Sequence, residues 1–216
     1  MTLGAFVSGW AGYGALYPVL SELLDFVVPF VDTDLEQGEE NLVRRLTGGE
    51  VLVAWSTGAH MVLRLRKTLF PRYRRVVLAA PFVAFYDYVP RETVRAMLDS
   101  LLAEGPQRTA RAFYRNCGMR GALPEVPVEH GPALAAGLEY LLTSRAVLAL
   151  DEDGSRVRIL HGASDRIVPM QASAHVAGLL SGSWRSLIDA GHFVPEETLL
   201  AVLHEETGCD AFQPRG

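Results

Sequence analysis

The sequence predicts one α/β domain, built on a mainly parallel sheet of about six strands with helices on both faces. Short apolar runs alternate with longer segments of helical period, and several of these runs are apolar at successive positions. Consecutive apolar residues are typical of strands that are covered on both faces, as the strands of parallel sheets are. A third observation is one long helical segment that interrupts the alternation.

The predicted strands are the short runs rich in Val, Ile and Leu. They are Leu3–Ser8, Phe26–Val31, Val51–Trp55, Arg75–Ala80, Val157–Leu160 and Arg185–Ile188. The predicted helices between them are Ala15–Leu24, Glu36–Leu46, Gly58–Phe70, Met170–Leu180 and Glu196–Glu206. The order in which the strands pair is not readable from the sequence.

Residues 84–150 contain helical patterns without a convincing strand. The patterns are Arg91–Ala103, Gln107–Cys117 and Ala133–Leu142, separated by glycines and prolines. So much helix between two strands exceeds an ordinary crossover. We therefore expect residues 1–83 and 151–216 to form the core of the domain. Residues 84–150 should form a helical cap over the carboxyl edge of the sheet, where ligands bind in such folds.

Composition and charge exclude several classes of protein. The chain has 216 residues, of which 49% are apolar, and its net charge is −5. These values argue against disorder and against nucleic acid as the main partner. No run approaches the roughly 18 apolar residues of a membrane span, and no Lys or Arg precedes the first apolar run as in a secretory signal.

The cysteines and histidines indicate neither a disulfide framework nor a metal site. Cys117 and Cys209 belong to no CxxC motif or Cys/His cluster and read as free thiols of a cytoplasmic protein. The histidines lack metal-ligand spacing, and His60 and His161 read as packing or supporting residues. We expect a cytoplasmic monomer without a cofactor, a metal or a membrane contact.

Ser56 is the strongest candidate for a nucleophile. It stands in Val51-Leu-Val-Ala-Trp-Ser56-Thr-Gly58, where a buried strand runs directly into a helix. A serine on such a tight turn is exposed at the sheet edge, and the turn tolerates only small residues two positions before and after it. Ala54 and Gly58 meet this requirement, although glycine is usual at the first position. The alternative is that Ser56 only caps the helix.

Asp165 and His192 complete a candidate catalytic triad. Asp165 follows the strand Val157–Leu160, and His192 lies in a loop after Arg185–Ile188. Either residue alone is more often a helix cap or a solvated side chain. The order Ser, Asp, His, with each residue after a separate strand, predicts a nucleophile, an orienting acid and a general base. Asp189 competes for the acid, but it is expected to end its own strand.

The loop after the first predicted strand should complete an oxyanion hole. In this architecture one backbone N–H comes from the residue after the nucleophile, here Thr57, and the other from the first loop, here Trp10. The side chain of Trp10 is expected to pack, which is compatible with this role. Ser8 and Ala11 replace the usual His and second Gly of that loop, but neither change removes a main-chain donor.

The same loop supports a rival interpretation. Gly9, Gly12 and Gly14, with Asp32 closing the second strand, resemble a dinucleotide-binding fingerprint with its ribose-binding acid. The glycine spacing does not fit, and this interpretation leaves Ser56, Asp165 and His192 unexplained. A dehydrogenase is therefore the weaker hypothesis.

These motifs resemble those of the α/β-hydrolase superfamily across nearly the whole chain. Within it the chain is similar to the carboxylesterases of biotin synthesis in Ser8-Gly-Trp-Ala-Gly, Val53-Ala-Trp-Ser-Thr-Gly, Gln107-Arg-Thr-Ala-Arg-Ala-Phe113 and Leu134–Leu142. The resemblance implies a serine esterase that hydrolyses pimeloyl-[acyl-carrier-protein] methyl ester, releases methanol and ends chain elongation. It also implies an acyl pocket lined by aromatic residues such as Phe82, Phe85, Tyr86 and Phe113.

An acyl carrier protein is the partner that the resemblance implies. Residues 91–120 contain six arginines and three acidic residues, whereas the rest of the chain is acidic. A positive cap would steer an acidic carrier to the pocket. Arg108 matches a docking position of the family, and Arg111 and Arg115 should share its helix face; the alternative is a solvated face. Other hydrolase activities (esterase, thioesterase or lactonase) and a non-catalytic binding module remain alternatives.

Overall fold

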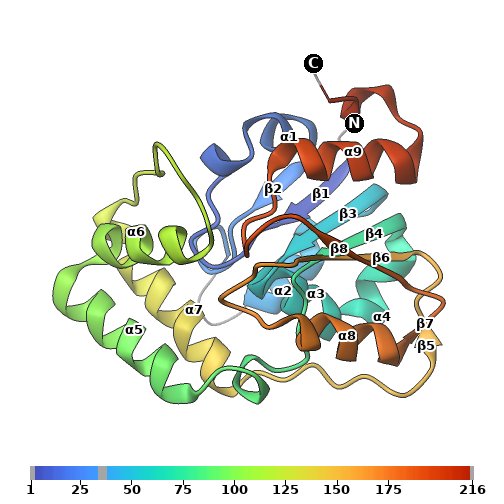
Figure 1. Cartoon of the computed structure of the whole chain (residues 1–216). Coiled ribbons are helices and arrows are strands. Elements are labelled where there is room, and N and C mark those ends of the chain that lie inside the picture. The colour runs from blue at the N-terminus through green and yellow to red at the C-terminus, as the bar shows by residue number, and fades with distance from the viewer. Residues whose placement is uncertain (1–2, 34–37, 215–216) are drawn as a thin grey trace.

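The computed structural model describes residues 3–33 and 38–214 and confirms the predicted fold class (Figure 1). In this part of the chain, six strands form one sheet in the order β2-β1-β3-β4-β6-β8, and each neighbouring pair is parallel. The strands are β1 (Gly4–Val7), β2 (Asp25–Val27), β3 (Gly49–Trp55), β4 (Tyr73–Ala79), β6 (Val157–Gly162) and β8 (Trp184–Ile188).

The strand order reverses direction at β1. From β1 the chain passes to β2 on one side and then crosses to β3 on the other side. In such sheets the crevice at the carboxyl ends of the strands where the order reverses is the usual place for a ligand. Val7 of β1 pairs with Ala54 of β3, so the loops that follow these two strands start side by side.

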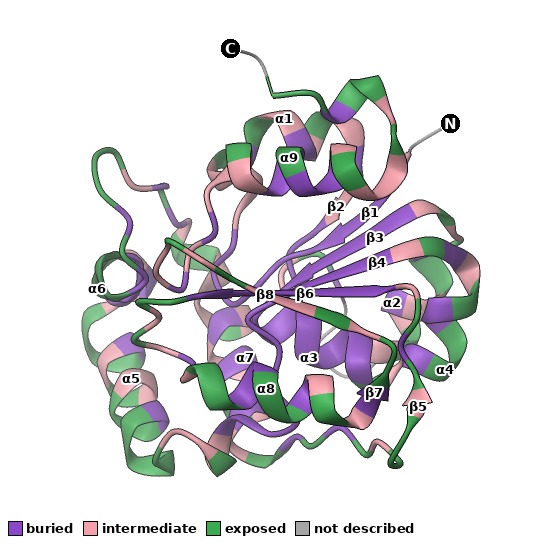
Figure 2. Cartoon of the chain, turned by 45° about the vertical axis from the view of Figure 1, so that its right-hand side comes forward, coloured by how far each residue is buried: buried purple, intermediate pink, exposed green. Residues whose placement is uncertain are grey.

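Helices cover both faces of this sheet, as Figures 1 and 2 show. One face carries α1 (Pro18–Leu23) and α9 (Glu196–Thr207), and the other carries α2 (Gly38–Arg45), α3 (Thr57–Arg64), α4 (Arg66–Leu69) and α8 (Met170–Leu179). Phe6 and Val53 belong to one core cluster, and their neighbours Ala5 and Leu52 belong to the other. This alternation explains why the strands are apolar at successive positions.

Three α-helices lie in the segment 84–150, between β4 and β6. They are α5 (Arg91–Glu104), α6 (Pro106–Asn116) and α7 (Gly131–Thr143). Helix α5 packs against both α6 and α7, and the group lies beyond one end of the sheet strands (Figure 1). A small two-stranded sheet of β5 (Glu152–Asp153) and β7 (Leu180–Ser181), which the sequence did not predict, lies apart from the main sheet.

The second strand is shorter than predicted, because the chain turns after Val27. Pro29 lacks the N–H that a ladder needs, and Phe30 has a φ of 68°. The carboxylate of Asp32 accepts a hydrogen bond from the backbone N–H of Val28 at 2.7 Å. The acid that would bind a ribose in the dinucleotide interpretation therefore closes this turn instead.

Three predicted helices differ from the observed ones. The predicted helix Ala15–Leu24 is divided into a 3-10 helix (Gly14–Leu16) and α1, which begins at Pro18. The predicted helix Glu36–Leu46 begins at residues that lie outside the described part of the chain, and α2 is described from Gly38. The predicted helix Gly58–Phe70 is divided at Leu65 into α3 and α4. Arg66, only 5% exposed, turns inward there and donates hydrogen bonds to the carboxylate of Glu152 and to the carbonyl of Leu63.

The described residues set limits on other classes of site. None of their helices is long and apolar enough to cross a bilayer, and nowhere in the described ranges do three His, Cys, Asp or Glu side chains gather as metal ligands would. Cys117 and Cys209 are both free thiols.

Gly58 is the position where α3 comes closest to β1. A Cβ at Gly58 would lie 2.3 Å from the carbonyl oxygens of Val7 and Ser8. We predict that Gly58→Ala lowers the free energy of unfolding by about 2 kcal/mol, since the clash is with backbone. Gly178→Ala is the matched control, because its Cβ would meet nothing within 4 Å in α8. This control should stabilise by about 0.5 kcal/mol. Urea unfolding measures both, and equal stabilities would contradict the close approach.

Candidate active site

Ser56 stands at the junction of β3 and α3 in a rarely occupied backbone conformation. Its φ is 54° and its ψ is −117°. The surrounding structure holds it there, because its N–H donates to the carbonyl of Ala79 at 2.8 Å and its own carbonyl accepts from the N–H of His60 at 2.9 Å. A strained strand-to-helix turn of this kind presents the serine hydroxyl at the carboxyl edge of the sheet.

The structure brings the three predicted triad side chains into one hydrogen-bonded chain. Nε2 of His192 lies 2.8 Å from Oγ of Ser56, and Nδ1 of His192 lies 2.8 Å from Oδ2 of Asp165. An ionised carboxylate only accepts, so Nδ1–H donates to Asp165 and Nε2 is left to accept the serine proton. Asp189, the competing acid, is exposed and makes no such contact with His192.

The environment of Asp165 keeps it ionised. Burial raises the pKa of this carboxyl, but His192 and the backbone N–H groups of Val168 and Ile167 more than offset that and lower the pKa below its ordinary value. The two backbone groups donate to Oδ1 at 2.9 and 2.8 Å, which leaves Oδ2 to the imidazole. The carboxylate is thereby fixed in charge and in orientation.

A second buried histidine lies beside Asp165. Nε2 of His161 is 2.9 Å from the carbonyl of Val168 and 3.5 Å from Oδ2 of Asp165. Because a carbonyl only accepts, Nε2 carries the proton. Burial lowers the pKa of His161, so the ring is neutral. Its Nδ1 is buried without a hydrogen-bond partner in the described part of the chain. The sequence placed His161 among the packing or supporting residues.

The two predicted oxyanion donors belong to segments that meet beside Ser56. Thr57 is the first residue of α3, so its backbone N–H has no partner within the helix. Trp10 follows β1, and both residues line the pocket in which Ser56 lies. A Cβ at Gly9 would lie 3.1 Å from Cβ of Ser56, so this glycine lets the first loop pass closely against the serine.

Three hydrogen bonds join the first loop to the segment 84–150. The indole N–H of Trp10 donates to the carbonyl of Leu134 at 2.8 Å, and the hydroxyl of Tyr114 donates to the carbonyl of Ala11 at 2.8 Å. A third bond joins the hydroxyl of Tyr13 to Nδ1 of His130 at 3.0 Å. The packing role expected of the Trp10 side chain is therefore an attachment to α7.

The loop that carries His192 is held from two sides. The indole N–H of Trp55 donates to the carbonyl of His192 at 2.9 Å, and the N–H of Phe193 donates to the carbonyl of Cys117 at 3.1 Å. Burial raises the pKa of the Cys117 thiol well above its usual value, so it stays protonated and is a structural residue.

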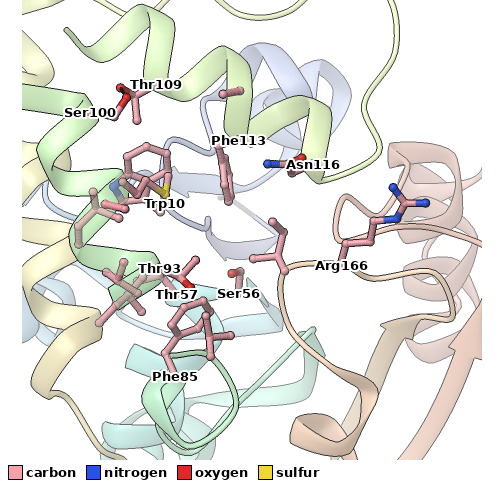
Figure 3. Close-up of a pocket in the computed structure, with 18 residues that line it drawn as sticks. Trp10, Ser56, Thr57, Phe85, Thr93, Ser100, Thr109, Phe113, Asn116 and Arg166 are labelled. Carbon is pink, nitrogen blue, oxygen red and sulfur yellow. Dashed lines mark hydrogen bonds between the residues drawn. The ribbon is translucent and has the colours of Figure 1, made fainter. Parts of the chain in front are cut away.

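Ser56 opens into a largely apolar pocket of about 370 Å³ (Figure 3). Phe85 and Phe113, both predicted as pocket residues, line it. Val89, Met97, Leu138, Leu141 and Ile167 also line it and were missed by the sequence interpretation. Such residues cannot be recognised in advance, because apolar positions on a helix face indicate burial without saying whether a cavity or core lies beneath.

Two of the predicted pocket residues lie elsewhere. Phe82 is fully buried and stacks on the ring of His60, with 4.9 Å between centroids. Tyr86 lies outside the pocket, with the guanidinium of Arg91 at 3.9 Å from its ring centroid. Both predictions were wrong, because aromatic content alone does not show which way a loop residue points.

The three predicted docking arginines lie along α6. Arg108 pairs with Glu104 at 2.9 Å and remains largely exposed. Arg111 and Arg115 are exposed as well and form no ion pair with a described residue. The structure therefore brings Arg108, Arg111 and Arg115 onto one helix at the outer side of the pocket.

The chain is similar in sequence to known hydrolases. The sequence model of the alpha/beta hydrolase family matches residues 9–204. A protein of Aromatoleum aromaticum described as a pimeloyl-[acyl-carrier protein] methyl ester esterase is 26% identical over 198 residues, which cover 80% of this chain and 79% of that protein.

Solved structures show the same fold. An esterase from Exiguobacterium antarcticum gives a TM-score of 0.63 at 15% identity, over 94% of this chain and 93% of that one. An esterase from Thermogutta terrifontis gives a TM-score of 0.62 at 18% identity, over 95% and 89% of the two chains.

We predict that His161 positions Asp165 for its bond to His192. His161→Leu should lower kcat about tenfold, the lower end of the loss seen when a group that orients a metal-bound histidine is removed. It should also shift the acidic limb of the kcat/KM profile, because Asp165 loses the N–H of His161 that lies 3.5 Å from its Oδ2.

Two variants control this prediction. His161→Gln keeps an N–H donor and should restore much of the rate and the profile. His60→Leu removes another buried histidine, which bonds to Phe82 and Ser144 and not to Asp165, so it should destabilise the fold without moving the limb. An unchanged pH profile in His161→Leu would leave this residue a packing role only.

Proposed function

The chain belongs to the alpha/beta hydrolase family, and from that premise we propose that it is a serine carboxylesterase acting on an ester attached to an acyl carrier protein. The observation that carries this proposal is the hydrogen-bonded chain of Ser56, His192 and Asp165 beside an apolar pocket. The most specific substrate that we propose is pimeloyl-[acyl-carrier-protein] methyl ester, as a step of biotin synthesis.

The acylation step follows from the geometry of the triad. Nε2 of His192, 2.8 Å from Oγ of Ser56, takes the serine proton as the oxygen attacks the ester carbonyl. The backbone N–H groups of Trp10 and Thr57 stabilise the oxyanion that forms. His192 then gives its proton to the departing alkoxide, which leaves as the alcohol, while Asp165 stabilises the imidazolium.

Deacylation reverses the roles of the two partners. A water molecule gives its proton to His192 and attacks the carbonyl of the acyl-serine. The second tetrahedral intermediate collapses as Ser56 recovers its proton from the imidazolium, and the acid is released.

The apolar lining of the pocket supports a chain-like acyl group. Its lining is mostly aliphatic and aromatic, with Phe85 and Phe113 among the larger side chains. Ser100 and Thr109 line a part of the pocket that lies away from Ser56 in Figure 3. An extended chain bound along this path would reach the surface between α5 and α6.

Charge on α6 supports a carrier-linked substrate. Arg108 adjoins Thr109, a lining residue, and Arg111 lies one turn further along the same helix. A row of exposed cations at the outer end of the pocket would attract an acidic carrier and would not be needed for a free ester. The name of the Aromatoleum relative is consistent with such a substrate.

The role of Ser56 is tested with a serine-reactive fluorophosphonate. We predict that the wild-type protein is labelled and that Ser56→Ala is not, with a loss of about 10³-fold or more in hydrolysis of short p-nitrophenyl esters. Ser100→Ala, which alters another serine of the same pocket, should remain labelled. Equal labelling of the two variants would reject the nucleophile.

Carrier docking is tested by reversing charge on α6. Arg108→Glu with Arg111→Glu should lower kcat/KM for the carrier-linked ester at least tenfold and leave a free methyl ester within twofold. The control is Arg44→Glu with Lys67→Glu, which changes the net charge equally at exposed positions elsewhere. Equal losses on the carrier-linked and free esters would remove the docking role. Failure to rescue a biotin auxotroph that lacks its own esterase would reject the specific substrate.

A further inference from the structure

A second pocket, of about 430 Å³, adjoins the first one and is lined by charged residues. Arg115 and Arg120 come from the end of α6 and the turn that follows it, and Arg166 comes from the loop after β6. This arginine pocket, defined by Arg115, Arg120 and Arg166, plays no part in the steps derived above.

The arginine pocket lies directly beside the apolar pocket of Ser56. Asn116 and Arg166 line both pockets. In Figure 3 these two residues stand at one side of the apolar pocket, and the guanidinium of Arg166 points away from Ser56. Gly191, which also lines the arginine pocket, directly precedes His192. Asn116 and Arg166 therefore form the boundary that the two pockets share.

The three guanidinium groups are not neutralised by the protein. None of them forms an ion pair with a residue in the described ranges, whereas Arg64, Arg66 and Arg145 are each paired with a carboxylate. The single carboxylate in the lining is Asp189, and it too forms no ion pair there. Like charges around one depression repel each other, and a bound anion would relieve that repulsion.

Backbone contacts fix the segments that carry these arginines. The N–H of Ser164 donates to the carbonyl of Ala190 at 3.0 Å, which joins the loops after β6 and β8. The N–H of Phe193 donates to the carbonyl of Cys117, and a Cβ at Gly191 would lie 2.5 Å from the same oxygen. The end of α6 is thus packed directly onto the loop of His192, so the arginine backbones are placed relative to the catalytic residues.

We infer that the arginine pocket is a subsite for an anionic group of the substrate, which projects from the ester bound at Ser56 past Asn116 and Arg166. Guanidinium groups match carboxylate and phosphate oxygens in paired hydrogen bonds. The anion is either a free carboxylate on the substrate or the phosphate of a carrier's prosthetic arm. In the second case the arm would leave past Arg166 and not between α5 and α6. The inference rests on the proposed function only in taking Ser56 as the place where the ester reacts.

The experiment compares matched anionic and neutral substrates in Arg120→Gln/Arg166→Gln. One arm uses aryl half-esters of dicarboxylic acids against the same esters with the free acid capped as an amide. The other arm uses a methyl ester acyl chain on phosphopantetheine against the same chain on pantetheine. We expect the preference for the anionic member, as the ratio of kcat/KM values, to fall at least tenfold in one arm, which identifies the anion.

Added salt and a control variant separate charge from packing. The wild-type preference should also fall with ionic strength, because exposed charges are screened. The control is Arg44→Gln/Arg95→Gln, which removes two exposed arginines outside the pocket and should keep the preference.

Binding to the Ser56→Ala protein gives a readout that does not need turnover. Calorimetry with inorganic phosphate and with glutarate should show binding that Arg120→Gln/Arg166→Gln weakens at least tenfold. If neither anion binds and the preference is unchanged in both arms, the subsite is rejected. Binding without any change in preference would mean an adventitious ion only and would reject it as well. Failure of the proposed catalytic function is separate, since it appears as turnover that persists in Ser56→Ala.

Discussion

The structure depends on one strained residue, Ser56, whose backbone occupies a conformation that costs of the order of 1–3 kcal/mol. Hydrogen bonds to Ala79 and His60 stabilise it, and Gly58 allows α3 to pack directly on the carbonyl groups of β1. Because Ser56 is fixed, the triad requires only that the loops after β6 and β8 lie at the same edge of the sheet as Ser56. The parallel sheet ensures this, since all its strands end at the same edge.

The sheet and the triad were predictable because their signals are local or depend only on chain order. Apolar runs mark strands that are covered on both sides, and the small residues around Ser56 mark the tight turn. Strand order depends on pairings between distant segments, so no local pattern contains it. The end of β2 was missed because its apolar run continues past Pro29, and the break at Leu65 was missed because the inward turn of Arg66 depends on Glu152, far along the chain.

The lining of the two pockets could not be predicted in full either, because it also depends on contacts between distant segments. Phe85 and Phe113 were correctly identified as pocket residues. Phe82 and Tyr86 are aromatic as well and were predicted for the same reason, but they lie elsewhere. The arginine pocket was invisible in the sequence, because Arg115, Arg120 and Arg166 come from segments whose proximity only the fold establishes. Charge counted along residues 91–120 indicated a positive region but not which cations face the catalytic centre.

The bonds between the first loop and the helices of residues 84–150 have a mechanical consequence. Trp10, Ala11 and Tyr13 are each tied to a residue of that segment. If α6 and α7 swing outward to admit a molecule, these bonds must break or the loop must move with the helices, away from the serine. An opening of this size would therefore move Trp10, one of the two proposed oxyanion donors, away from Ser56. On the proposed function, hydrolysis would then require α6 and α7 to be closed over the site.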